Sequence, residues 1–132
     1  MKLENQVCSL ELAKKLKELG FSQESVWYYS WHKTDNPPMP QLDTDFKNVP
    51  NEFFDRANFV KVAAFTCAEL GEMLQDYSGN VEYDGKFKKW RIIYFESSYT
   101  TEIIGSEADA RAKLLIYLLE NKLLDKPKLK ED

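Results

Sequence analysis

The sequence predicts a single α+β domain in which an antiparallel meander of about four strands carries two to three helices on one face. Helix-type and strand-type segments follow one another in the order α, β, irregular insertion, α, β, β, β, α, without the regular βα alternation of parallel sheets. An Asp-Gly pair separates two strand-like runs, as in antiparallel hairpins. The 132 residues, 43% of them hydrophobic, suffice for one core. We expect residues 1–124 to form this domain and 125–132 a flexible tail.

The first helix is expected over about residues 10–19. Leu12, Leu16 and Leu19 recur at helical spacing, and Gly20 supplies a C-terminal stop. The aromatic and β-branched run 26–31 then predicts the first strand.

A long irregular insertion is expected around residues 32–58. The prolines of 36–40 oppose regular strand pairing and favour an extended, polyproline-like path. Because compact domains rarely hold so long a structureless stretch, we expect a short helical turn near 52–56. A short strand is expected over 59–65.

Thr66 and Glu69 fit a capping box, which predicts a second helix running to about Gln75. The runs 80–83 and 87–95 flank Asp84-Gly85 and predict a hairpin with a two-residue type I′ turn. Its second arm alternates Trp90, Ile92 and Tyr94 on one face with Lys89 and Arg91 on the other. A further strand is expected over 99–104.

The last helix is expected to begin at a cap formed by Ser106 and Asp109. Its segment Leu114–Leu119 is apolar all round, which predicts burial on more than one face. This helix should be the centre of the core or part of an oligomer interface, so a homodimer is possible.

Composition limits the function classes. The net charge of −4 disfavours a broad nucleic-acid-binding surface. Two cysteines and one histidine, without ligand spacing, give no metal site, and a reducing, cytoplasmic location with free thiols is expected. No apolar run approaches the length of a membrane span, and no phosphate or dinucleotide loop points to a cofactor.

The leading hypothesis is a non-enzymatic protein that binds an unknown protein partner. Four aromatic residues crowd five positions of the first strand, and a strand buries both faces only when something covers each of them. The segment 35–55 that follows is acidic. The candidate partner-binding residues are Trp27, Tyr29, Trp31, Asp43 and Asp45.

The alternative is a nucleic-acid-binding regulator. Its candidate residues, in which positive charges interleave with an aromatic ring as in single-strand binders, are Lys86, Lys88, Lys89, Trp90 and Arg91. The N-terminal stretch 9–27 also resembles a helix-turn-helix opening, although Ser22 to Trp31 contains no Lys or Arg.

A small enzyme is the third hypothesis. Cys67 would lie in the first turn of the second helix, where the helix dipole lowers a thiol pKa. An enzyme would require Cys67 or Glu72 to meet His32, and no local motif links these residues. No catalytic residue is therefore assigned.

Three blocks resemble those of small uncharacterised proteins encoded in prophages and other mobile elements of gut bacteria. They begin Leu3-Glu4-Asn5-Gln6-Val7-Cys8-Ser9, Phe65-Thr66-Cys67-Ala68-Glu69 and Glu107-Ala108-Asp109-Ala110-Arg111, and run on to Gly20, Leu74 and Leu124. The resemblance covers the expected helices and implies a shared fold and a phage-related role. It carries no activity, so no site residue is transferred from it, and residues 32–59 depart from its pattern.

Overall fold

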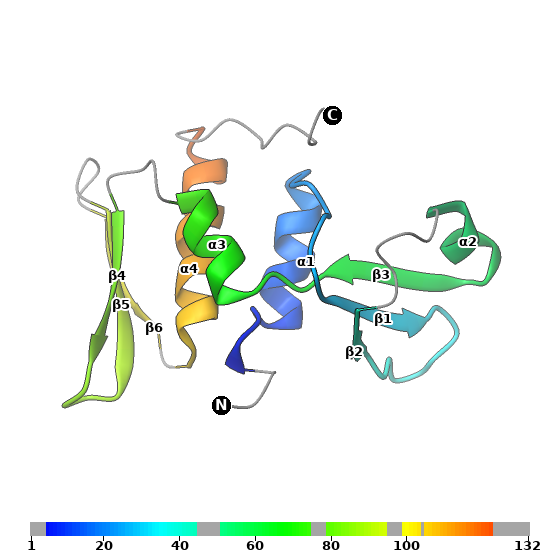
Figure 1. The fold of residues 1–132 in the computed structure, drawn as a ribbon, viewed down its shortest axis with the longest axis horizontal. Coiled ribbons are helices and arrows are strands. Elements are labelled where there is room, and N and C mark those ends of the chain that lie inside the picture. Colours follow the sequence, from blue (N-terminus) through cyan, green and yellow to red (C-terminus); the bar gives the residue numbers. More distant parts are fainter. Residues whose placement is uncertain (1–4, 45–50, 75–78, 95–98, 104, 123–132) are drawn as a thin grey trace.

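The structure is a computed structural model that describes residues 5–44, 51–74, 79–94, 99–103 and 105–122. The expected tail at 125–132 and Asp45 lie outside the described residues. Helices form a central layer, and a small sheet lies on each side of it (Figure 1). The α+β class expected from the sequence is confirmed.

The helical layer contains α1 (Leu10–Glu18), α3 (Cys67–Leu74) and α4 (Glu107–Glu120). The first sheet has the antiparallel order β2-β1-β3, and α2 (Asn51–Arg56) packs against β3. Its strands are β1 (Tyr28–His32), β2 (Gln41–Asp43) and β3 (Phe59–Ala63). The second sheet has the antiparallel order β4-β5-β6, with β4 (Gly79–Asp84), β5 (Lys89–Tyr94) and β6 (Tyr99–Ile103).

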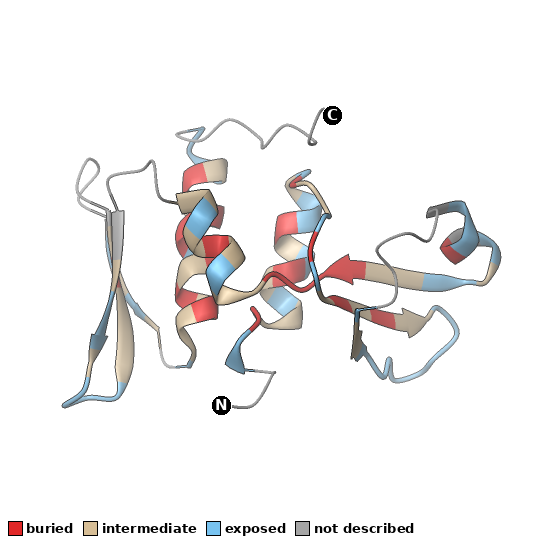
Figure 2. Cartoon of the chain, in the orientation of Figure 1, coloured by how far each residue is buried: buried red, intermediate tan, exposed pale blue. Residues whose placement is uncertain are grey.

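The expected single meander with helices on one face is wrong, because the strands form two sheets on opposite sides of the helices. The reason lies in α4, which is buried on two sides (Figure 2). Its residues Ala110, Leu114 and Leu118 pack with Ile92 of the second sheet. Its residues Ala108, Ala112 and Leu115 belong to a second cluster with α1 and β3. The expectation that Leu114–Leu119 form the centre of the core is confirmed.

The insertion is more ordered than expected over residues 41–43, which form β2 and pair with β1. A three-residue strand is too short to show a periodic pattern, and its pairing depends on the neighbouring edge of β1. The expected helical turn is confirmed as α2. The Asn36-Pro37 peptide bond within the insertion is cis.

The hairpin between β4 and β5 is confirmed, but its expected two-residue type I′ turn is wrong. Asp84 pairs with Lys89, which leaves a four-residue loop. The Asp84 side chain accepts hydrogen bonds from the N–H groups of Lys86 (3.0 Å) and Phe87 (3.3 Å), and Lys88 takes the positive φ of 53°. Side-chain capping by Asp84 therefore replaces the tight Asp-Gly turn.

The helix-turn-helix interpretation is wrong. Gly20 ends the first helix with a φ of 83°, as expected, but no second helix follows it. Residues 21–27 are irregular, and β1 begins at Tyr28. Aromatic and β-branched residues favour the strand over a recognition helix.

Candidate functional site

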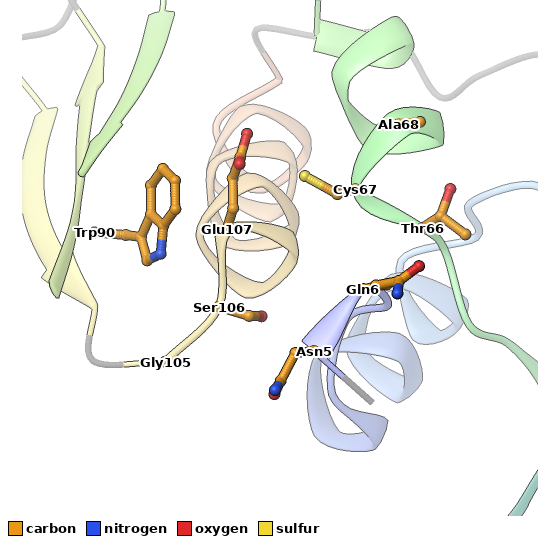
Figure 3. Close-up of a pocket in the computed structure, with 9 residues that line it drawn as sticks. All are labelled: Asn5, Gln6, Thr66, Cys67, Ala68, Trp90, Gly105, Ser106 and Glu107. Carbon is orange, nitrogen blue, oxygen red and sulfur yellow. The ribbon is translucent and has the colours of Figure 1, made fainter. Parts of the chain in front are cut away.

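A cleft of about 740 Å³ lies between the second sheet and the helical layer, and we call it the Trp90 cleft. Figure 3 shows Trp90 of β5 on one side, Cys67 and Thr66 on the other, and Glu107 between them. The remaining lining is small or polar. The lining residues are Asn5, Gln6, Thr66, Cys67, Ala68, Trp90, Gly105, Ser106 and Glu107.

Two helix starts and the N-terminal segment build the helical side of this cleft. An isolated bridge between Val7 and Thr66 brings the N-terminal segment to the start of α3, and the Cys67 N–H donates to the Gln6 carbonyl at 2.9 Å. At the start of α4, the Ser106 hydroxyl accepts from the Asp109 N–H at 3.1 Å. At the start of α3, the Thr66 N–H donates to Glu69 and the Glu69 N–H donates to the Thr66 hydroxyl. Both expected caps are therefore confirmed, and both helix starts line the cleft.

Aromatic side chains form the opposite wall. Tyr83 and Trp90 are cross-strand partners, with ring centroids 5.0 Å apart. Trp90 is half-buried against the α4 cluster, whereas Tyr83 is 54% exposed. The aromatic wall of the cleft therefore continues onto the open surface of the hairpin.

The charged groups at the cleft are largely satisfied within the chain. Glu107 forms an ion pair with Arg111 one turn along α4, and the Arg111 guanidinium donates to the Cys67 carbonyl at 3.0 Å. Gly71 on α3 makes room for this guanidinium, because a β-carbon there would clash with it. The cleft offers an aromatic face and polar hydrogen-bonding groups, with its carboxylate already neutralised.

Cys67 does not have the lowered pKa expected of a residue at a helix start. Burial raises the pKa of its thiol, the nearby Arg111 lowers it, and the charge and hydrogen bond of Glu107 raise it. His32 ends β1 in the first sheet, where its ring meets Phe59 (5.1 Å between centroids) and its Nδ1 meets the Thr34 hydroxyl (2.6 Å). The structure does not bring His32 into the cleft with Cys67, and Glu72 is exposed on α3.

The aromatic residues proposed to meet a partner are packed within the chain. Tyr29 and Trp31 pack against the core cluster that includes α1, and the Tyr29 hydroxyl donates to the Cys8 carbonyl at 2.7 Å. Tyr28 is buried on the other face, beneath Lys61. Trp27 and Asp43 are half-buried. Intramolecular packing therefore accounts for the aromatic crowding of this strand.

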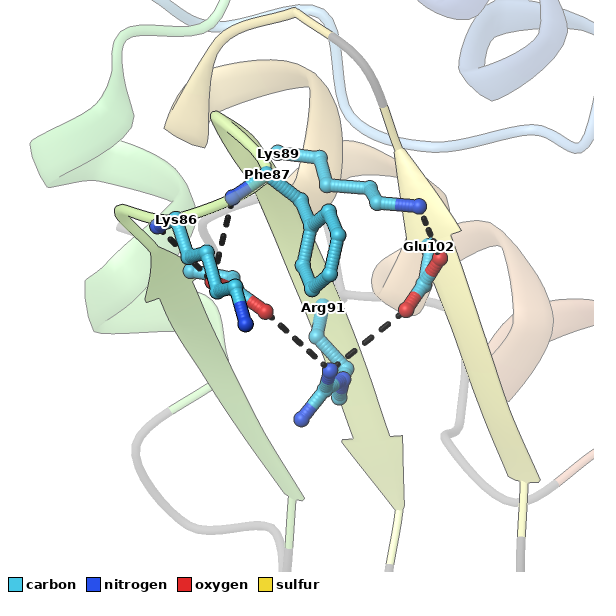
Figure 4. Close-up of polar contacts among 6 residues, drawn as sticks. Lys86, Phe87, Lys89, Arg91 and Glu102 are labelled. Atoms are coloured by element: carbon cyan, nitrogen blue, oxygen red, sulfur yellow. Dashed lines mark hydrogen bonds and ion pairs between the residues drawn. The ribbon is translucent and has the colours of Figure 1, made fainter.

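Two of the four basic residues of the hairpin are paired with acids (Figure 4). Lys89 pairs with Glu102 at 2.6 Å, and Arg91 pairs with Glu102 at 3.4 Å and with Asp84 at 3.5 Å. The hydrogen bond and charge of Lys89 hold the pKa of Glu102 below its usual value. The Phe87 ring is 61% exposed, with the ammonium groups of Lys86 and Lys89 each 5.5 Å from its centroid. As expected, Lys89 and Arg91 lie on one face of β5 and the buried Ile92 lies on the other.

Within the described residues, no group of three or more His, Cys, Asp or Glu side chains is placed to hold a metal ion. None of the described helices combines the length and apolar character required to cross a bilayer. Comparisons of the chain with protein-family models, curated proteins and solved structures gave no match.

Sequence reasoning identified Trp90 and both caps but did not join them into one site. The capping signals located the starts of α3 and α4, and the hairpin pattern placed Trp90 on the inner face of β5. Asn5 and Gln6 had no local signal, because only the Val7–Thr66 bridge carries them to the cleft.

Proposed function

We propose that this chain is a non-enzymatic accessory protein of a phage or mobile element that binds a protein partner in the cytoplasm. The phage or mobile-element origin rests on the three resembling blocks. The reducing compartment rests on the two cysteines, which are both free. Partner binding rests on one surface, formed by the Trp90 cleft and the exposed side chain of Tyr83 beside Trp90.

The open aromatic wall carries the argument for a protein partner. Trp and Tyr are enriched among the residues that dominate interface energies, particularly where they surround a pocket that a partner side chain can fill. Tyr83 and Trp90 form such a pair beside a cleft of about 740 Å³. Amide and hydroxyl groups of Asn5, Gln6 and Ser106 line the same cleft and can hydrogen-bond a polypeptide backbone.

This surface replaces the one expected around residues 27–55. Tyr28, Tyr29 and Trp31 make packing contacts within the chain. These contacts explain why aromatic residues are concentrated in this strand, so a partner is not needed to explain it. Tyr83, in contrast, is 54% exposed beside Trp90.

The experiment is affinity capture with tagged protein from host cells that carry the parent element, with and without nuclease, read by mass spectrometry. Tyr83→Ala should abolish or strongly reduce a nuclease-resistant complex, because loss of a central aromatic contact weakens binding by about 30-fold or more. Phe53→Ala is the matched control, since Phe53 is similarly exposed (56%) but lies on α2 beside the first sheet. A complex lost with Phe53→Ala and kept with Tyr83→Ala would contradict this surface.

Nucleic-acid binding remains the second candidate, because Phe87 is exposed between two ammonium groups. An exposed ring beside cations is the arrangement on which single-stranded bases stack. Binding of mixed oligonucleotides at low salt, weakening steeply as salt rises and lost in Lys86→Ala/Phe87→Ala, would support it. The ion pairs of Lys89 and Arg91 with Glu102 and Asp84 compete with phosphate, which favours the protein partner.

A further inference from the structure

We propose that β6 is a self-association edge, where two copies of the chain pair their β6 strands antiparallel about a two-fold axis. The pairing joins two three-stranded sheets into one sheet across the dimer. This interface is the edge of the second sheet, next to the strand that carries Trp90, and it does not involve the last helix, whose apolar side chains are mostly buried within the chain.

The chemistry of β6 differs from that of the other sheet edges. β6 is the end strand of the second sheet, and its one charged residue, Glu102, is already paired with Lys89 and Arg91 of β5. Natural proteins protect such edges with lysine, proline or unpaired inward charges, and β6 has none of these. It therefore presents a strand that can accept a further strand.

The other edges are less suited to self-pairing. The opposite edge of the same sheet is β4, which carries Glu82 and Asp84 on its outer face. A two-fold β4 pair that keeps like faces together over residues 80–84 would place Glu82 opposite its own copy, and like charges directly opposite are destabilising. In the first sheet, β2 has only three residues, and β3 is packed against α1 and α2.

The register of the β6 pair follows from its sequence. Side chains keep to one face only if residues of the same parity face each other across the pair. The full-length register that satisfies this places Thr101 opposite Thr101 of the second copy and Thr100 opposite its Glu102. Threonine pairs and a hydroxyl facing a carboxylate are favourable cross-strand neighbours.

The helix-facing side of the second sheet is incompletely covered at β6, and this also supports β6 as the strand that pairs with a second copy. Thr101 pairs with Ile92 and Ile103 with Trp90, so these β6 residues lie on the face that is turned to the helices. The helix α4 packs mainly over β4 and β5, and Thr101 and Ile103 are only half-buried. A second β6 alongside would cover more of this face.

The contact spans five residues of each copy. Such a strand pair is smaller than the roughly 800 Å² per partner of a standard interface, so we expect a concentration-dependent dimer. Sedimentation equilibrium from about 10 µM to about 1 mM should show the average mass rising from that of one chain toward two. A single-chain mass across this range would overturn the proposal.

Charge variants test the register. Thr100→Glu places like charges opposite each other twice per dimer and should weaken association roughly tenfold, whereas Thr100→Lys faces Glu102 of the second copy and should strengthen it. Glu82→Gln on β4 is the control and should leave association unchanged. Association that is strengthened by Glu82→Gln and unaffected by Thr100→Glu would assign the contact to β4 and overturn the proposal.

Cross-linking tests the two-fold axis directly. Opposed residues of an antiparallel pair have Cα atoms about 4.5 to 5.5 Å apart, within the range that a disulfide spans. Thr101→Cys should therefore form a disulfide between two copies under mild oxidation, identified by peptide mapping. Thr100→Cys, whose copies are offset along the strands, should cross-link much less, and equal cross-linking of both variants would refute the register.

Discussion

At the scale of single residues, the two cysteines show how burial sets side-chain chemistry. Cys8 is fully buried behind the Val7–Thr66 bridge, and desolvation raises the pKa of its thiol from 9.0 to about 12. Cys67 lies at a helix start, yet burial and Glu107 also raise its pKa. Both thiols are therefore held in the neutral form, which makes them poor nucleophiles.

The Cys8 thiol should make stability fall at high pH. The unfolded chain loses this proton near pH 9, whereas the folded protein keeps it until about pH 12. Between these values the free energy of unfolding should drop by up to about 1.4 kcal/mol per pH unit from this group. Urea denaturation of the wild type and Cys8→Ala from about pH 8 to about pH 11 measures it. The variant should be less stable at neutral pH and show the shallower decline, and parallel curves would contradict the prediction.

At the scale of elements, the capping box of α3 not only caps its own helix but also binds the segment that precedes β1. Thr66 and Glu69 exchange the expected hydrogen bonds at 2.8 and 3.1 Å. Glu69 also accepts from the Ser25 hydroxyl at 2.8 Å and from the Val26 N–H at 3.3 Å. One carboxylate thus joins the start of α3 to the segment that leads into β1.

Removal of Glu69 should cost more than removal of an ordinary cap. Glu69→Ala removes the acceptor of the Thr66 and Val26 N–H groups and the nearer of two acceptors of the Ser25 hydroxyl. It should lower the free energy of unfolding by about 2 to 3 kcal/mol, against about 1 kcal/mol for Thr66→Ala. Glu72→Ala, exposed on the same helix, is the control and should change stability by less than about 0.5 kcal/mol. Denaturant titration gives the free energy of unfolding of the three variants. Equal losses for Glu69→Ala and Glu72→Ala would show that the hydrogen bonds of the Glu69 carboxylate do not stabilise the protein.

At the scale of the whole molecule, α4 joins two packing clusters. Leu115 is fully buried in the cluster with α1 and β3, and Leu118 in the cluster with the second sheet. The two sheets are not paired with each other in the described part of the chain, so α4 carries much of the coupling between them.

Shortening a buried side chain on one or the other side of α4 should therefore destabilise different parts of the protein. Leu115→Ala and Leu118→Ala should each cost about 2 to 5 kcal/mol, because each leaves a cavity in a closed cluster. Hydrogen exchange should locate the effects separately, with Leu118→Ala raising exchange mainly in β4 and β5 and Leu115→Ala mainly in β3 and α1. Identical exchange patterns would mean that the two clusters unfold as one unit.

The sequence by itself determined the local elements. Helical spacing and capping residues predicted α1, α3 and α4, and strand composition predicted β1, β3 and the hairpin, because these signals act between residues close in the chain. The all-apolar segment Leu114–Leu119 also predicted a helix buried on more than one face. The short β2 and the hairpin loop were not foreseen, since partner edges and a side-chain cap decide them.

Tertiary structure alone decided how these elements combine. The division into two sheets follows from which side of α4 each strand covers, and no local pattern encodes that choice. The Trp90 cleft arises where two helix starts and one strand converge from distant parts of the chain. Packing also turned Tyr29 and Trp31 inward while leaving Tyr83 and Phe87 exposed. Residue type is a local property, whereas burial depends on what the whole chain places against each side chain.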